Sequence, residues 1–173
     1  YDVLNRLNYL LYKLPGISDM TAEEKNQVAA QCYFIRALTH FNLVRLFGAI
    51  PIKTEPTLDL NSNLNVERNS VDEVYDQIWN DLSEAEGVLT EENAGYITNG
   101  AVLSLQAKVA LYQEEYDLAI SKASTAINSG YELEANYSDL FNQSVGKEAI
   151  FVILFNEQDG NRLAEYFFPT SLG

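Results

Sequence analysis

The chain has 173 residues, of which 47% are hydrophobic, so it can bury a core and has the length of one domain or one large part of one. Its 25 acidic and 11 basic residues give a formal net charge of -14, which argues against nucleic acid as a partner. A single cysteine excludes an intrachain disulfide framework, and no apolar run reaches the roughly 18 residues that a membrane span needs.

The first predicted element is an amphipathic helix that Pro15 and Gly16 end. Its apolar residues recur at helical spacing: Val3, Leu7, Leu10, Leu11 and Leu14. Tyr1 lies directly in this pattern, and no signal-peptide pattern precedes it. We therefore interpret residues 1–173 as a fragment of a longer protein.

The second predicted helix begins with a capping box, in which Thr21 caps the helix and Glu24 reaches back to it. It runs to about Phe47 and is apolar on most of its sides. Gly48 and Pro51 stop it. A helix with so few polar stripes is typical of the interior of a larger assembly.

A polar segment, residues 53–69, follows this helix and contains Pro56 and four asparagines. It is too polar to bury and too long for a simple turn between helices, so we expect an exposed loop. Ser70 and Glu73 then form a second capping box. Behind it, apolar residues at spacings of three and four predict a third helix: Val71, Val74, Ile78, Leu82, Ala85 and Leu89.

Two further helices are predicted after a loop at 90–98 that contains Tyr96. Thr98 or Asn99 caps the first, from about 100 to 113, and the second runs from Tyr116 to about 128, with Gly130 closing it. Residues 131–141 indicate a loop with a short turn of helix. The apolar, β-branched run 149–155 predicts a short strand. The expected fold is therefore mainly all-α, with five helices followed by a small extended element.

The helix pair from Ala101 to Ile127 resembles a tetratricopeptide repeat. The second helix has the small and aromatic residues of that repeat at matching positions: Tyr116, Ala119, Ile120, Ala123, Ala126 and Ile127. The large Trp and the closing Pro of the repeat are absent. The resemblance implies a right-handed helical repeat, in which neighbouring helix pairs stack because neither helix can bury its apolar stripe alone.

A second resemblance covers nearly the whole chain. Residues 36–51 read RAL-x-x-F-x-L-V-x-L-F-G-x-I-P, and the blocks 68–85, 99–112 and 129–151 follow in order. This pattern resembles the SusD/RagB family, the glycan-binding lipoproteins of the Bacteroidetes outer surface.

The resemblance implies a surface-exposed lipoprotein of the outer membrane that binds an oligosaccharide or polysaccharide, as in a starch-utilisation system. The implied partner is a TonB-dependent, SusC-like transporter, over which such proteins form a lid. The lipidated cysteine of the family lies upstream of this chain, so Cys32 is not that residue. The second half of the family's longer members shapes much of the glycan site.

The second predicted helix contains four residues that could bind a metal, act as a nucleophile or form ion pairs. His40 is the only histidine, and without a nearby ligand pattern it favours a core position over a metal site. Cys32 has no second histidine to activate it, so we interpret it as packing. Arg36 and Arg45 each need an acidic or carbonyl partner, with a place in the transporter-facing surface as the alternative.

Paired carboxylates are numerous, at 23–24, 91–92, 114–115 and at Asp72 with Asp76, but they fall at helix starts or turns. There the helix dipole favours the ionised form, whereas a glycosidase needs one acid with a raised pKa. The chain also has no phosphate loop, nucleophile elbow or calcium-loop spacing. We expect no catalytic residue, no metal site and no cofactor.

Sugar binding needs an aromatic face and polar groups for the hydroxyls. Trp79 lies among apolar helix positions and favours packing. The candidates are instead in the loops: Lys53, Glu55, Asn61, Asn63, Arg68 and Tyr96. An asparagine-rich loop is also compatible with a plain solvated connection.

Two functional readings follow. The first is a non-enzymatic component that captures oligosaccharides for a transporter. The alternative is a tetratricopeptide-type scaffold for protein interactions with no ligand of its own.

Overall fold

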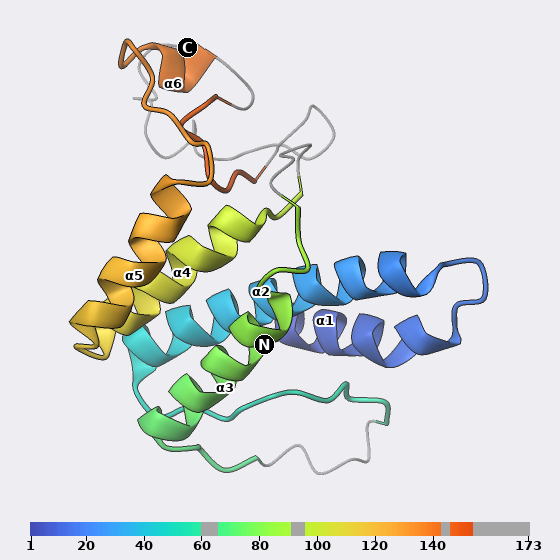
Figure 1. Ribbon diagram of the computed structural model, residues 1–173. Coiled ribbons are helices and arrows are strands. Elements are labelled where there is room, and N and C mark those ends of the chain that lie inside the picture. The colour runs from blue at the N-terminus through green and yellow to red at the C-terminus, as the bar shows by residue number, and fades with distance from the viewer. Residues whose placement is uncertain (60–65, 91–95, 143–145, 154–173) are drawn as a thin grey trace, which may run out of the picture.

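The computed structural model describes residues 1–59, 66–90, 96–142 and 146–153 (Figure 1). These residues form helices and connections, and the one extended pairing among them is a single antiparallel bridge between Ile50 and Asn69. In chain order the elements are α1 (Asp2–Lys13), a 3-10 turn η1 (Leu14–Gly16), α2 (Ala22–Phe47), α3 (Val71–Ala85), α4 (Asn99–Tyr112), α5 (Tyr116–Ile127) and α6 (Asp139–Asn142).

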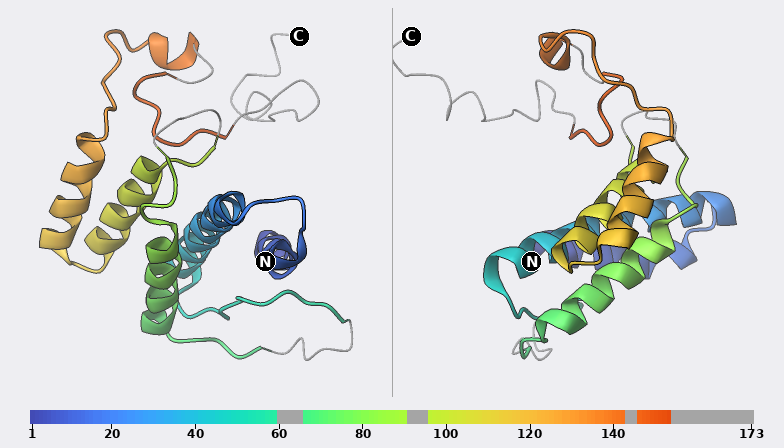
Figure 2. Two further views of the ribbon diagram at one scale, coloured as in Figure 1. Left: turned by 45° about the vertical axis from the view of Figure 1, so that its right-hand side comes forward. Right: turned by 60° about the vertical axis from the view of Figure 1, so that its left-hand side comes forward.

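Helix α2 is the central element of the structure. Its sequence is apolar on most sides because α1 and α3 pack on different faces of it, and α2 lies between them in Figure 2. Helices α4 and α5 lie side by side as the predicted helix pair, with Ala119 and Ala126 of α5 buried (Figure 1). The fold is thus the helical arrangement that the periodicity predicts, with the tetratricopeptide-like character that the resemblance of the helix pair implies.

The core runs along the interface of α2, α3 and α4. Its members are fully or almost fully buried apolar residues: Ala30, Phe34, Ala37, Phe41, Val44, Val74, Ile78, Leu82, Ala85, Val102, Leu105 and Val109. No helix among the described residues combines the length and the apolar character needed to cross a bilayer.

Both predicted capping boxes are present. The backbone N–H of Glu24 donates to Thr21 Oγ1 (3.2 Å), and that of Glu73 donates to Ser70 Oγ (3.2 Å). The carboxylate of each glutamate accepts from the backbone N–H of the residue that caps its helix. These bonds satisfy donors that a helix start otherwise leaves unpaired, which explains why the two helices begin there.

Helix α3 ends earlier than its apolar repeat predicts. Glu86 leaves the helix with an extended backbone, and Gly87 adopts a φ of +74°. Leu89 is still buried, although it packs from a non-helical segment. The repeat therefore marked burial correctly from Val74 to Leu89, but Val71 is exposed and the repeat overstated the length of the helix.

The predicted strand at 149–155 is not formed in its described part, 149–153, which consists of bends and coil. Ile150 packs against the helical core, and the Phe151 ring meets Phe34 edge-on at 5.4 Å between centroids. The run is apolar because it covers helices; its described residues pair with no neighbouring strand.

Candidate functional site

The first part of the segment after α2 is bound to α1 through its backbone. Asn8 of α1 donates from Nδ2 to the carbonyl oxygens of Lys53 (3.0 Å) and Glu55 (3.3 Å). Asn5 accepts a hydrogen bond from the backbone N–H of Thr57 at 2.8 Å. The side chain of Glu55 is exposed and that of Lys53 is half-buried. This stretch is therefore a fixed connection, although most of its side chains face solvent.

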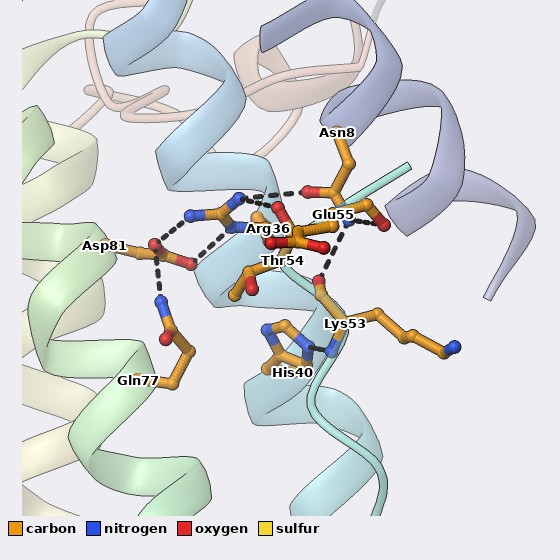
Figure 3. Close-up of polar contacts among 8 residues, drawn as sticks. All are labelled: Asn8, Arg36, His40, Lys53, Thr54, Glu55, Gln77 and Asp81. Carbon is orange, nitrogen blue, oxygen red and sulfur yellow. Dashed lines mark hydrogen bonds and ion pairs between the residues drawn. The ribbon is translucent and has the colours of Figure 1, made fainter. Parts of the chain in front are cut away.

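A buried ion pair lies beneath this connection (Figure 3). Arg36 of α2 donates from Nε and Nη2 to the two carboxylate oxygens of Asp81 on α3, at 2.9 and 2.6 Å. Its Nη1 donates to Asn8 Oδ1 (2.9 Å) and to the Thr54 carbonyl (3.4 Å). Burial raises the pKa of Asp81, and the bonds from Arg36 oppose this effect. Arg36 thus has the acidic and carbonyl partners that we expect for a buried arginine.

His40 lies beside the same cluster and is fully buried. Its Nε2 accepts the backbone N–H of Lys53 at 3.5 Å, and its Nδ1 has no hydrogen-bond partner among the described residues. Burial, aided by the charge of Arg36, lowers the pKa of His40 to about 4, so the ring is neutral at ordinary pH. No group of three potential metal ligands occurs among the described residues. His40 is a core histidine.

Three further residues of α2 and α3 contact other side chains or lie in the interior: Arg45, Trp79 and Cys32. The Arg45 guanidinium donates to Tyr112 Oη (3.3 Å) and to Asn42 Oδ1, and lies 4.5 Å from the centre of the Phe41 ring. Trp79 is half-buried and donates from Nε1 to the side chain of Gln113 at 2.6 Å. Cys32 is buried, and burial raises the pKa of its thiol. The predicted packing of Trp79 and Cys32 is confirmed.

A groove with a volume of about 450 Å3 opens between the N-terminal half of α2 and the segment that joins α3 to α4. The residues that line it are Met20, Glu24, Gln27, Val28, Gln31, Leu89, Thr90, Tyr96 and Ile97. Positions 24, 27, 28 and 31 share one face of α2 because they are three or four residues apart. Residues 89–90 and 96–97 of the joining segment complete the groove.

The groove combines an aromatic ring with polar groups. Tyr96 is 65% exposed, whereas Leu89 and Ile97 are buried. Gln27 and Gln31 are half-buried, and each side chain offers two N–H donors and one carbonyl acceptor. An exposed ring can stack on the C–H face of a sugar while amides bind its hydroxyl groups. A concave site with an apolar wall and a few polar groups is the usual form of a small-ligand site.

Comparison with known proteins identifies the family. The family model described as "Starch-binding associating with outer membrane" matches residues 1–129. The chain belongs to this SusD-like family. It is 32% identical to the starch-binding protein SusD of Bacteroides thetaiotaomicron over an alignment of 181 positions, which covers 96% of this chain and 31% of that protein. The chain spans about a third of the length of the curated relatives it matches.

Solved structures support the same assignment for the fold. A laminarin-binding SusD-like protein is 33% identical, with a TM-score of 0.73 over 80% of this chain and 32% of its own. A structure solved with a xylogluco-oligosaccharide is 25% identical, with a TM-score of 0.83 over 98% of this chain and 38% of its own. The SusD-like chain thus has the helical fold of proteins whose names record glucan ligands.

The structure separates the candidate residues that the sequence suggests. Lys53, Glu55 and Arg68 belong to the segments that join α2 to α3 and run along one side of α2 (Figures 1 and 2), whereas Tyr96 precedes α4 and lines the groove beside the N-terminal half of α2. Asn61 and Asn63 lie outside the described residues. Binding by these residues stays a prediction. Of the set, Tyr96 is the one that lines the groove.

Sequence reasoning missed the α2 wall of this groove. The signal was available in part, because Glu24, Gln27 and Gln31 form a polar stripe at helical spacing. That stripe alone does not distinguish a binding wall from a solvated helix face. The approach of Tyr96, which is distant in sequence, makes the difference.

The described carboxylate pairs at 23–24 and 114–115 lie at a helix start and a turn in this SusD-like chain, whereas Asp76 lies one turn after Asp72 within α3. Glu23 and Glu24 are in the first turn of α2, and Glu114 is in the turn before α5, with a φ of +64°. The hydrogen bonds of the capping boxes lower the pKa of Glu24 and Glu73. This shift is opposite to the raised pKa that a general acid needs. The pair at 91–92 lies outside the described residues.

Proposed function

We propose that this SusD-like chain is the glycan-binding part of an outer-membrane nutrient-uptake system. It captures oligosaccharides at the groove under Tyr96 and passes them to a TonB-dependent transporter, without chemistry of its own. The observation that carries the proposal is the groove, whose lining brings together an exposed tyrosine, two glutamine side chains and the buried side chains of Leu89 and Ile97. The relatives named for starch and laminarin support a glucan as ligand.

Calorimetric titration of the intact protein with malto-, laminari- and xylogluco-oligosaccharides tests this proposal. We expect one of these series to bind, and Tyr96→Ala to weaken its binding by about tenfold or more, equivalent to roughly 1.4 kcal/mol, because the stacking face is lost. Tyr116→Ala is the matched control, because Tyr116 is similarly exposed at 58% but lies on α5, away from the groove.

Two results would contradict the proposal. Unchanged affinity in Tyr96→Ala would remove the groove as the site. Failure of the intact protein to bind any oligosaccharide would favour a protein-interaction scaffold instead.

The partner and the location are further parts of the proposal. A lipid anchor upstream of this chain holds the protein on the outer surface of the outer membrane, beside the transporter. The family description, which names association with the outer membrane, supports this placement. Purification of the tagged intact protein from detergent-solubilised outer membranes is expected to recover a TonB-dependent transporter with it. Recovery of the protein alone would count against the transporter partnership.

A further inference from the structure

The charge of the groove points to the class of glycan that it accepts, an inference that rests on the proposed function. Among the nine residues that line the groove, Glu24 is the one with a charged side chain. The other polar groups are the amides of Gln27 and Gln31 and the hydroxyls of Thr90 and Tyr96. Among the described residues, the lining of the groove therefore carries one negative charge and no positive one.

The carboxylate of Glu24 is held in place and kept ionised. Its Oε2 accepts hydrogen bonds from the backbone N–H of Thr21 (2.7 Å) and from the Thr21 hydroxyl (2.8 Å). These bonds lower the pKa of Glu24. The capping box thus has a second consequence, because it fixes a negative charge at the wall of the groove.

No neighbouring cation along α2 offsets this charge. Lys25, the next residue, donates from Nζ to the carbonyl oxygen of Pro15 at 3.1 Å. It lines a separate hollow between α1 and α2, together with Leu11 and Leu14. The whole chain adds a formal net charge of -14, so an anionic ligand meets repulsion at long range as well.

We propose that the groove under Tyr96 selects uncharged oligosaccharides and rejects glycans that carry carboxylate or sulfate groups. Hydroxyl groups of a neutral sugar find donors and acceptors in Gln27 and Gln31. An anionic group placed there finds no basic side chain among the described lining residues and lies near the Glu24 carboxylate. A fixed negative charge in a site disfavours anionic ligands, and it can therefore discriminate between ligands of similar shape.

The test compares a neutral oligosaccharide that the intact protein binds with the same oligosaccharide oxidised at C6 to the uronate. At about 20 mM salt we expect the oxidised ligand to bind at least about tenfold more weakly than the neutral one. This difference in affinity, called the gap below, is expected to narrow at about 0.5 M salt because the charges are screened. Glu24→Gln is expected to shrink the gap, measured as the ratio of the affinities of the same variant for the neutral and the oxidised ligand. Glutamine at this position also suits a capping box, so the helix start is retained.

A neighbouring substitution provides the control. Glu23→Gln removes the same charge from the same helical turn, but Glu23 does not line the groove, so the gap is expected to persist. Gln31→Lys adds a cation to the groove and is expected to improve binding of the oxidised ligand.

The outcomes separate the two proposals. Absence of any binding that depends on Tyr96 would overturn the proposed function. Binding of the neutral ligand together with equal or tighter binding of the oxidised one would overturn the selectivity alone. A gap that responds equally to Glu24→Gln and Glu23→Gln would also overturn it, because the discrimination would then come from overall charge.

Discussion

At the scale of single residues, His40 shows how burial sets a charge state. The folded protein keeps the ring neutral, with a pKa of about 4 against 6.5 for the ordinary side chain. The unfolded chain therefore binds more protons than the folded one between these values, so the stability that the neutral ring contributes is full above pH 6.5 and is lost as the pH falls toward 4. The size of the shift corresponds to about 3 kcal/mol.

The lowered pKa of His40 predicts how replacing the ring changes the pH dependence of the free energy of unfolding. His40→Gln retains an acceptor for the Lys53 N–H but cannot be protonated. We expect its free energy of unfolding to fall less than that of the wild type between about pH 7 and pH 4.5, by roughly 2–3 kcal/mol. Urea unfolding at the two pH values measures the difference. An identical loss in both proteins would show that His40 does not contribute to acid sensitivity.

At the scale of elements, the ion pair between Arg36 and Asp81 connects three helices and the connection at 53–55. Its side chains are 7% and 2% exposed, and Asn8 extends the network to α1. An ion pair buried in this way fixes how helices meet more than it adds net stability, because the loss of hydration offsets much of the attraction. The consequence is an asymmetry between single and double replacement.

We predict that Asp81→Leu alone lowers the free energy of unfolding by about 3–5 kcal/mol, because it leaves the guanidinium of Arg36 buried without its partner. The double variant Arg36→Met with Asp81→Leu is expected to lose much less. Glu132→Gln serves as a control, since it breaks an exposed pair with Lys147 and should leave the unfolding midpoint unchanged. Equal losses in the single and double variants would contradict this account.

The individual elements also show which parts of the fold and of the candidate site could be predicted from the sequence. Capping boxes and helical repeats located α1 to α5, because these are local features read from a few neighbouring residues. The end of α3 and the run at 149–153 were predicted wrongly, since Leu89 and Ile150 are apolar for reasons of tertiary packing. Tyr96 was found as a loop aromatic. Gln27 and Gln31, which line the same groove, were not, because their polar stripe alone does not show which distant segment lies opposite it.

At the scale of the whole molecule, one helix performs two tasks. The part of α2 that carries the family pattern places Arg36, His40 and Phe41 in the interior, whereas Leu46 and Phe47 at its end are exposed. The N-terminal half of α2 provides the polar wall of the groove. The pattern that identifies the family thus builds the scaffold, while the residues that we propose for binding lie before it on the same helix.

Hydrogen–deuterium exchange of the intact protein, with and without a saturating neutral oligosaccharide, tests the central claim most directly. Our account predicts that the ligand slows exchange in peptides covering residues 20–31 and 89–97, and that this protection is lost in Tyr96→Ala. Protection confined to residues 53–69, with no change around Tyr96, would contradict the account and would return the binding site to the polar segment after α2.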